Sequence, residues 1–287
     1  MFSRESGSIL VSAVHDADTI ASAANPFRKM FLTKSAMTSS HLTVITGASR
    51  GLGRAMAEQL LQPGRRLLCI SRRSDDQLAK LAREAGAELE QWQLDLAEPV
   101  VAAERLSAWL GSLDGAAFDS ATLINNAGTV GRIRPLSEAV PADLSQALRV
   151  GLESAMLLTA AFLGSTKGWR GDRKVLNISS GLGRNAMGSQ APYCAAKAGM
   201  DHFSRAVALE EKGPGAARIV SLAPGVIDTD MQVELRGGDP AMFPDRERFE
   251  RLKADGKLDS PQSAAAKVLK YLDRTDFGSN PVADVRD

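Results

Sequence analysis

The stretch that decides the fold reads Thr46-Gly47-Ala48-Ser49-Arg50-Gly51-Leu52-Gly53. The apolar run at residues 42–46 predicts a buried strand, and residues 54–62 predict a helix. Between them the three glycines follow a G-x-x-x-G-x-G spacing, which permits a tight turn and a close approach of the backbone to a ligand. The N-terminus of the following helix offers free N–H groups and the positive end of its dipole. The stretch therefore predicts a strand–turn–helix unit that binds a pyrophosphate, rather than a plain connecting turn.

The same alternation of short apolar runs and helical patterns continues along the chain. The predicted strands are 42–46, 66–71, 89–95, 121–125, 174–179 and 217–222, and the predicted helices are 54–62, 75–85, 99–110, 141–163 and 192–211. This spacing predicts βαβ units in a parallel sheet with helices on both faces, which is a doubly wound, Rossmann-like α/β fold. We expect a single domain over residues 37–287. Residues 1–36 show no sustained period and predict a poorly ordered N-terminal extension, with an ordered arm that covers a neighbour as the alternative.

The composition of the 287-residue chain excludes several classes of function. Its formal net charge is +1, so no electrostatic feature favours a nucleic-acid or membrane partner. No run reaches the roughly 18 uncharged apolar residues of a membrane span. The two cysteines provide no disulfide framework, which favours a reducing, cytoplasmic location. The three histidines are scattered along the chain, and we expect no metal site.

The end of the second predicted strand indicates which dinucleotide would bind. In a sheet of this kind an acidic residue at that position holds the ribose hydroxyls of NAD. Here Ile70 is followed by Ser71, Arg72 and Arg73, and Arg50 lies in the glycine loop. Guanidinium groups pair well with phosphate oxygens, so this corner suits a 2′-phosphate. We predict NADP(H) as the cofactor; arginines that are simply solvated are the alternative.

Two further loops at the same edge of the sheet complete the predicted cofactor site. Asp95 and Leu96 follow the third strand and should lie beside the adenine. Asn126, Ala127 and Gly128 follow the fourth strand in a small turn that exposes its backbone. Since the carboxyl ends of parallel strands share one edge, this turn can run along the ribose of the cofactor.

Chemistry is indicated by the pair Tyr193 and Lys197, which are four residues apart and share one face of a helix. An ammonium group one turn away favours the phenolate, so we expect the pKa of Tyr193 to be lowered toward neutral pH. A hydroxyl from the end of the preceding strand, Ser180 or its neighbour Ser179, could hydrogen-bond the same substrate oxygen. The alternative for the pair alone is a surface tyrosine stacked on a lysine stem.

Taken together, these features resemble the short-chain dehydrogenase/reductase family over nearly all of residues 42–287. The resemblance rests on the glycine stretch, the Asn-Asn-Ala-Gly turn, and the spacing of Ser180 and Tyr193, which are thirteen residues apart. It implies that Tyr193 is a general acid, that Ser180 orients the carbonyl, and that Lys197 binds the nicotinamide ribose and lowers the tyrosine pKa. It also implies a loop that holds the nicotinamide, formed by Pro224, Gly225, Ile227 and Thr229.

The last third of the chain looks like the sepiapterin reductases of that family. The likeness lies in residues 223–232, 252–258 and 271–280 and in Asp284. In those enzymes a carboxylate near the C-terminus anchors the guanidine-like edge of a pterin, and Asp284 is the matching position; an aspartate in solvent is the alternative. Bacterial relatives of the subgroup can instead reduce aromatic 1,2-diketones such as benzil. The likeness therefore indicates the subgroup more firmly than the substrate.

One position departs from the family pattern. Gly151 lies in the predicted helix 141–163 where the resemblance implies an asparagine that holds a water molecule for proton resupply. Glycine cannot hold that water with a side chain, so we expect a slower proton relay. After the nicotinamide loop, residues 236–250 are expected to form a mobile flap, in which Met242 and Phe243 either contact an aromatic substrate or pack the flap down.

The sequence thus predicts an NADPH-dependent carbonyl reductase for a small ketone or diketone, such as a pterin or a benzil-like compound. A 3-oxoacyl thioester reductase or another alcohol dehydrogenase of the family is the alternative enzyme, and a non-catalytic NADP(H)-binding sensor is the alternative of another class. By resemblance, helices 141–163 and 192–211 build a four-helix interface in a homodimer or tetramer. Burial of their apolar faces against their own sheet is the other possibility.

Overall fold

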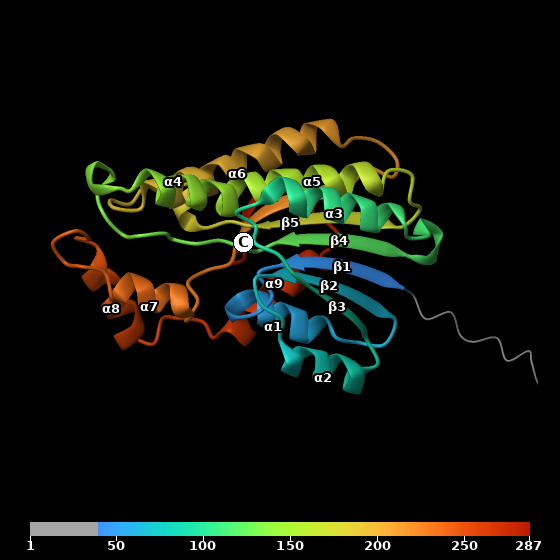
Figure 1. Cartoon of the computed structure of the whole chain (residues 1–287), viewed down its shortest axis with the longest axis horizontal. Helices are drawn as coiled ribbons and strands as arrows, with labels where there is room; N and C mark the ends of the chain where they lie inside the picture. The colour runs from blue at the N-terminus through green and yellow to red at the C-terminus, as the bar shows by residue number, and fades with distance from the viewer. Residues whose placement is uncertain (1–39) are drawn as a thin grey trace, which may run out of the picture. The chain divides into compact units, whose positions relative to one another are not determined.

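The computed structural model describes residues 40–287, so the predicted extension at residues 1–36 lies outside the described residues. Its centre is one parallel sheet of seven strands in the order β3-β2-β1-β4-β5-β6-β7 (Figure 1). The strands are β1 (His41–Thr46), β2 (Arg65–Ser71), β3 (Glu88–Gln93), β4 (Ser120–Asn125), β5 (Asp172–Ile178), β6 (Arg218–Ala223) and β7 (Val282–Asp284). The predicted doubly wound α/β fold is confirmed. The order of the strands reverses between β1 and β4, and a crevice forms at the carboxyl ends of strands at such a point.

Helices cover both faces of the sheet. The main helices are α1 (Gly51–Leu60), α2 (Asp76–Ala85), α3 (Pro99–Gly111), α4 (Pro141–Leu148), α5 (Ser154–Ser165), α6 (Ala191–Glu210), α7 (Asp230–Arg236), α8 (Arg246–Ala254) and α9 (Pro261–Leu272). Helices α1, α2 and α9 pack on one face, and α3, α5 and α6 pack on the other (Figure 1). Each face has its own apolar core, built around Met56 on the first and Phe162 on the second. The sheet separates the two cores. Because its strands are parallel, the loops that follow them lie at one edge, the carboxyl edge.

The ends of helices α1 and α2 show how the sequence sets their bounds. Helix α2 begins after Asp75, whose side chain accepts a hydrogen bond from the N–H of Leu78, and it ends at Gly86 with a left-handed φ of 66°. Helix α1 begins at Gly51, three residues before the predicted start at Arg54. Its first turn therefore includes the last glycines of the loop, and this brings the N–H groups of the helix to the loop itself.

The predicted helix over residues 141–163 is present as one uninterrupted helical segment, Pro141–Ser165, but its middle is not α-helical. A π-helical turn, Arg149–Glu153, separates α4 from α5, and the N–H of Ser154 bonds to the carbonyl of Arg149. Gly151 is buried in this turn, and a Cβ atom built on it would lie 3.1 Å from the Cβ of Ala196. Wider turns of this kind often occur at functional sites. The helices here approach each other so closely that glycine fits the position well.

The segment Pro141–Ser165 is long and apolar enough to pass a composition test for a membrane span. In the fold its α5 half contributes Leu158 and Phe162 to the core between helices and sheet. Both side chains are fully buried. The apolar composition of α5 is thus used in packing against the sheet and α3.

Residues 230–254, expected to include a mobile flap, form α7 and α8 with a small apolar cluster of their own. Phe243 is fully buried and stacks on Phe249, with 5.7 Å between ring centroids. Leu235 completes the buried part of this cluster. Of the two expectations for Phe243, the structure supports packing within this segment. Phe249, which sequence reasoning did not single out, reaches the cleft described next.

Candidate active site

A cleft of about 1080 Å³ opens at the carboxyl ends of the strands, where the strand order reverses. This volume is at the upper end of the range typical of small-molecule sites. Every site residue predicted from the sequence lines it: Gly47, Ser49, Arg50, Gly51, Leu52, Gly53, Arg72, Asp95, Leu96, Asn126, Ala127, Gly128, Ser180, Tyr193, Lys197, Pro224, Gly225, Ile227, Thr229 and Asp284. The fold therefore collects residues that are up to 237 positions apart in the chain into one site.

The glycine loop fits a pyrophosphate. Gly47 and Gly51 have φ angles of +68° and +57°, which glycine adopts without strain. A Cβ atom on Gly53 would lie 2.2 Å from the carbonyl oxygen of Gly47, so only glycine fits there. The helix α1 that follows has no side-chain cap at Arg50 and no acidic residue in its first turn. Its first N–H groups and its dipole are thus available to an anion.

Two side chains, Thr46 and Asn126, hold the glycine loop against the turn after β4. The Thr46 hydroxyl accepts hydrogen bonds from the N–H groups of Asn126 and Ala127, at 2.9 and 3.0 Å. The Asn126 amide donates to the carbonyl oxygens of Thr46 and Gly47. Sequence reasoning placed Asn126 along the cofactor but missed that it fixes the phosphate loop. A threonine that ends the first strand, directly before a glycine loop, was the available signal.

The corner after β2 carries the residues that were predicted to distinguish NADP(H) from NAD. Ser71 is buried there, and its hydroxyl has no hydrogen-bond partner among the described residues. Arg72 lines the cleft and pairs with no acidic side chain in residues 40–287, whereas Arg73 lies outside the cleft. Arg50 differs from the expectation, because its guanidinium forms an exposed ion pair with Asp230 of α7 at 2.8 Å. Ser71 and Arg72 therefore remain as the polar groups available to a phosphate.

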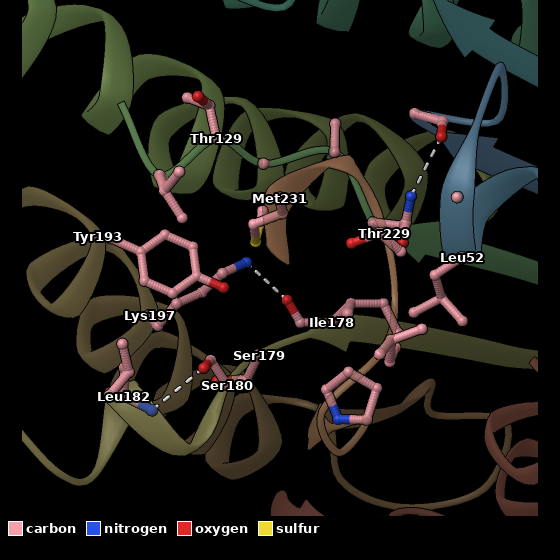
Figure 2. Close-up of a pocket in the computed structure, with 18 of the residues that line it drawn as sticks. Leu52, Thr129, Ile178, Ser179, Ser180, Leu182, Tyr193, Lys197, Thr229 and Met231 are labelled. Carbon is pink, nitrogen blue, oxygen red and sulfur yellow. Dashed lines mark hydrogen bonds between the residues drawn. The ribbon is translucent and has the colours of Figure 1, made fainter. Parts of the chain in front are cut away.

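Ser180, Tyr193 and Lys197 surround the middle of the cleft, as Figure 2 shows. Tyr193 and Lys197 lie on one face of α6, and the Lys197 nitrogen is 5.7 Å from the centre of the Tyr193 ring. The Ser180 hydroxyl, which follows β5, lies near the Tyr193 side chain and accepts a hydrogen bond from the N–H of Leu182. Lys197 is buried and donates to the carbonyl oxygen of Ile178 at 2.7 Å. Ser180 and Lys197 are thus held in place by backbone groups.

The protonation of the pair differs from the expectation. Burial raises the pKa of Tyr193, and the nearby Ser180 hydroxyl offsets only part of that rise. Burial also lowers the pKa of Lys197 to about 8, while the nearby charge of Asp201 acts in the opposite direction. The expected lowering of the tyrosine pKa is therefore wrong for this arrangement, because burial is the largest influence on the phenol and favours its neutral form. Tyr193 is therefore a protonated phenol at neutral pH, which is the form that can donate a proton.

Asp201, which the sequence reading did not single out, is a buried carboxylate one turn beyond Lys197. It accepts hydrogen bonds from the hydroxyls of Ser179 and Ser221, at 2.6 and 2.7 Å. The Arg184 guanidinium approaches its other oxygen at 3.2 Å. Ser179, weighed as an alternative to Ser180, also lines the cleft, but it is buried and its hydroxyl donates to Asp201. The four-residue spacing from Lys197 to Asp201 was the signal that could have found this group.

A second buried network, centred on Asn125 at the end of β4, fixes the helices beside the cleft. Its amide donates to Asn177 on β5 and to Thr159 on α5, at 2.8 and 3.1 Å. Asn177 in turn donates to Ser204 on α6 at 2.9 Å. Buried side-chain hydrogen bonds of this kind favour one arrangement of neighbouring elements, and here they do so although the Asn125 Oδ1 atom has no partner among the described residues. The network therefore fixes α5 and α6 relative to the strand ends that carry the site.

The far end of the cleft contains Asp284, the last residue of β7. Its carboxylate lines the cleft but is not open to it, because Arg286 binds both oxygens. The pKa of Asp284 is held below its usual range by that guanidinium. Within residues 40–287 no group of three or more His, Cys, Asp or Glu side chains is placed to hold a metal ion.

Comparison with known proteins places this site in context. The model of the short chain dehydrogenase family matches residues 41–239. Benzil reductase ((S)-benzoin forming) of Bacillus cereus is 36% identical over 240 residues, which cover 83% of this chain and 96% of that protein. Sepiapterin reductase of Meriones unguiculatus is 34% identical over 265 residues, covering 85% and 95%. The crystal structure of the KRED1-Pglu enzyme matches with a TM-score of 0.72 at 27% identity, over 85% of this chain and 100% of that one.

Proposed function

The chain belongs to the short-chain dehydrogenase family and is an oxidoreductase related to the benzil and sepiapterin reductases; from this premise we propose that it is an NADPH-dependent carbonyl reductase. The observation that carries the proposal is the position of the Tyr193 hydroxyl. It lies beside Ser180 and Lys197 in the same cleft as a glycine loop that suits a pyrophosphate. A proton donor and a dinucleotide site in one cleft are what the reduction of a carbonyl group requires.

The choice of NADP(H) over NAD(H) is supported by the corner after β2. Within residues 40–287 the buried Ser71 hydroxyl has no hydrogen-bond partner, and Arg72 at the cleft forms no ion pair. These groups would bind a 2′-phosphate, whereas an acidic residue would repel it. Arg72→Ala should therefore raise the KM for NADPH without changing that for NADH. Arg73→Ala is the matched control, since Arg73 has the same charge outside the cleft, and an equal effect of both variants would contradict the assignment.

The chain's own residues perform three tasks in the proposed reaction. When bound, the nicotinamide supplies the hydride. Ser180 donates a hydrogen bond to the substrate oxygen and holds the carbonyl near Tyr193, and Tyr193 then transfers its proton to that oxygen as negative charge develops. Lys197 is placed to bind the nicotinamide ribose and to support the tyrosine as it loses its proton. The raised pKa of Tyr193 keeps it protonated before the reaction, which favours reduction over oxidation.

The proposed substrate is a small ketone or diketone with an aromatic or similarly flat apolar body. The substrate end of the cleft carries the apolar side chains of Met187, Met231, Leu235, Phe249 and Leu252. Methionine and aromatic side chains adapt well to flat ring systems. An aromatic 1,2-diketone such as benzil and a pterin such as sepiapterin are the two substrate classes that the relatives' names suggest.

The test is the loss of NADPH absorbance on addition of benzil, sepiapterin or a 3-oxoacyl thioester, each compared with NADH. We expect turnover with at least one of the first two and a preference for NADPH. Reduction of the thioester alone would identify the alternative enzyme. Tight NADPH binding without turnover of any ketone would instead indicate a dinucleotide sensor, and the proposal would fail.

We also propose a cytoplasmic homodimer, with a tetramer as the alternative. The support is a set of exposed apolar side chains on the α4–α6 side of the molecule, namely Leu148, Met156 and Leu209. Leu209 is 72% exposed and would be covered in such an interface. Light scattering of the purified protein should give twice the chain mass, and Leu209→Glu should lower it if this face forms the contact.

A further inference from the structure

The far end of the cleft holds an ion pair whose two members differ sharply in burial. The side chain of Asp284 is only 13% exposed, whereas that of Arg286 is 76% exposed. The guanidinium donates from Nε to one carboxylate oxygen at 2.6 Å and from Nη2 to the other at 2.7 Å. Both residues line the cleft. The exposed guanidinium of Arg286 thus covers the Asp284 carboxylate, which lies in the wall of the cleft.

The position of Asp284 does not depend on Arg286. Strand β7 pairs with β6, and the Arg184 guanidinium donates to the carbonyl oxygen of Ala283 at 2.7 Å. Arg184 is itself held by the buried carboxylate of Asp201. The Asp284 carboxylate would therefore stay at the cleft wall if the side chain of Arg286 moved away or were removed.

The chemistry of the pair decides which ligands can use this end of the cleft. A carboxylate in a cleft wall, such as that of Asp284, can accept two parallel hydrogen bonds from a ligand with two adjacent N–H donors, as in a cyclic guanidine. Arg286 carries that same donor pattern and is tethered two residues away, so such a ligand must displace it. A ligand whose far end only accepts hydrogen bonds has no such competitor. It instead meets the remaining guanidinium donors of Arg286, which line the cleft.

We propose that Arg286 determines specificity by occupying Asp284, so that the enzyme prefers substrates whose far end accepts hydrogen bonds over substrates that present a cyclic guanidine. In chemical terms, a second carbonyl of a vicinal diketone is favoured, and the 2-aminopyrimidinone edge of a pterin is disfavoured. The inference rests on the proposed carbonyl reductase function and narrows its substrate class to diketones. Arg286 acts on substrate choice and takes no part in proton or hydride transfer.

The test compares Arg286→Ala with a matched control, Arg274→Ala. Arg274 forms the same two-bond pair with Asp276 two residues away, at 2.8 Å for both bonds, and lies outside the cleft. Sepiapterin binding is measured by equilibrium dialysis with NADP⁺ present, so that turnover is not needed. We expect Arg286→Ala to bind sepiapterin about fivefold more tightly than the wild type, the upper range for loss of a largely exposed competing pair. Arg274→Ala should match the wild type.

A double variant tests whether the gain in sepiapterin affinity depends on the Asp284 carboxylate. Arg286→Ala combined with Asp284→Asn should lose the gain, because the uncovered carboxylate is what binds the donors. The kcat/KM ratio of benzil to sepiapterin should also fall in Arg286→Ala. Unchanged sepiapterin affinity in Arg286→Ala, or a gain that persists in the double variant, would overturn the proposal. Failure of the wild type to reduce any ketone would refute the proposed function separately, since the binding comparison does not use turnover.

Discussion

The replacement Gly53→Ala tests whether the backbone of the glycine loop is the cofactor cradle. The added Cβ would lie 2.2 Å from the Gly47 carbonyl oxygen and 2.4 Å from the Asn126 amide nitrogen, where ordinary contacts begin at 3.4 Å. The loop must therefore move by about 1 Å, and its neighbour is backbone that cannot rotate away. Overpacking of this kind costs about 2–3 kcal/mol, which for a domain of this size lowers Tm by roughly 4–12 °C.

The same shift should weaken binding of NADPH. A 1 Å displacement of the N–H groups that face the pyrophosphate is expected to reduce affinity by about 10- to 100-fold. Thermal unfolding and titration of the NADPH fluorescence measure the two effects. Gly111→Ala is the control, since a Cβ there meets no atom within 4 Å and that residue ends α3 on the far side of the sheet from this loop. A Gly53→Ala protein with wild-type Tm and NADPH affinity would refute the account of the loop.

Two further predictions concern the proton supply. Because burial lowers the pKa of Lys197 to about 8 and Asp201 raises it, kcat/KM should fall as the pH rises through about 8, where the ammonium is lost. Asp201→Asn should move that fall to lower pH, and an unmoved pH profile would contradict the role of Asp201. Gly151→Asn should raise kcat by restoring a side chain that holds water, at a Tm cost of a few degrees because the new Cβ lies 3.1 Å from Ala196. An unchanged kcat would mean that the relay does not depend on this residue.

Most of the sheet could be predicted because β1, β2, β4, β5 and β6 each contain a short apolar run between helical patterns. The last strand could not, since Val282–Asp284 has only three residues and pairs along one edge. The π-helical turn between α4 and α5 was also missed. Such a turn keeps helical composition, so periodicity alone does not reveal it, and the close approach of Ala196 to Gly151 appears only in the fold.

In the site, too, local sequence patterns could be predicted, whereas contacts between distant segments could not. The glycine loop and the Tyr193–Lys197 pair are local patterns, and the residues named from them all line the cleft. The contacts that tune them join distant segments: Asp201 with Ser221, Thr46 with Asn126, and Arg50 with Asp230. The direction of the Tyr193 pKa was predicted wrongly for a related reason. A charge four residues away is visible in the sequence, whereas the desolvation that outweighs it depends on the whole fold.

The central claim is that Tyr193 donates the proton in carbonyl reduction, and the variant Tyr193→Phe tests it most directly. The measurement is the rate of benzil reduction with saturating NADPH, together with the Kd of NADPH for the same protein. The account predicts that kcat falls by about 100-fold or more while the Kd for NADPH changes little, because the ring is kept and only the hydroxyl is lost. A Tyr193→Phe enzyme that reduces benzil at the wild-type rate would contradict the claim.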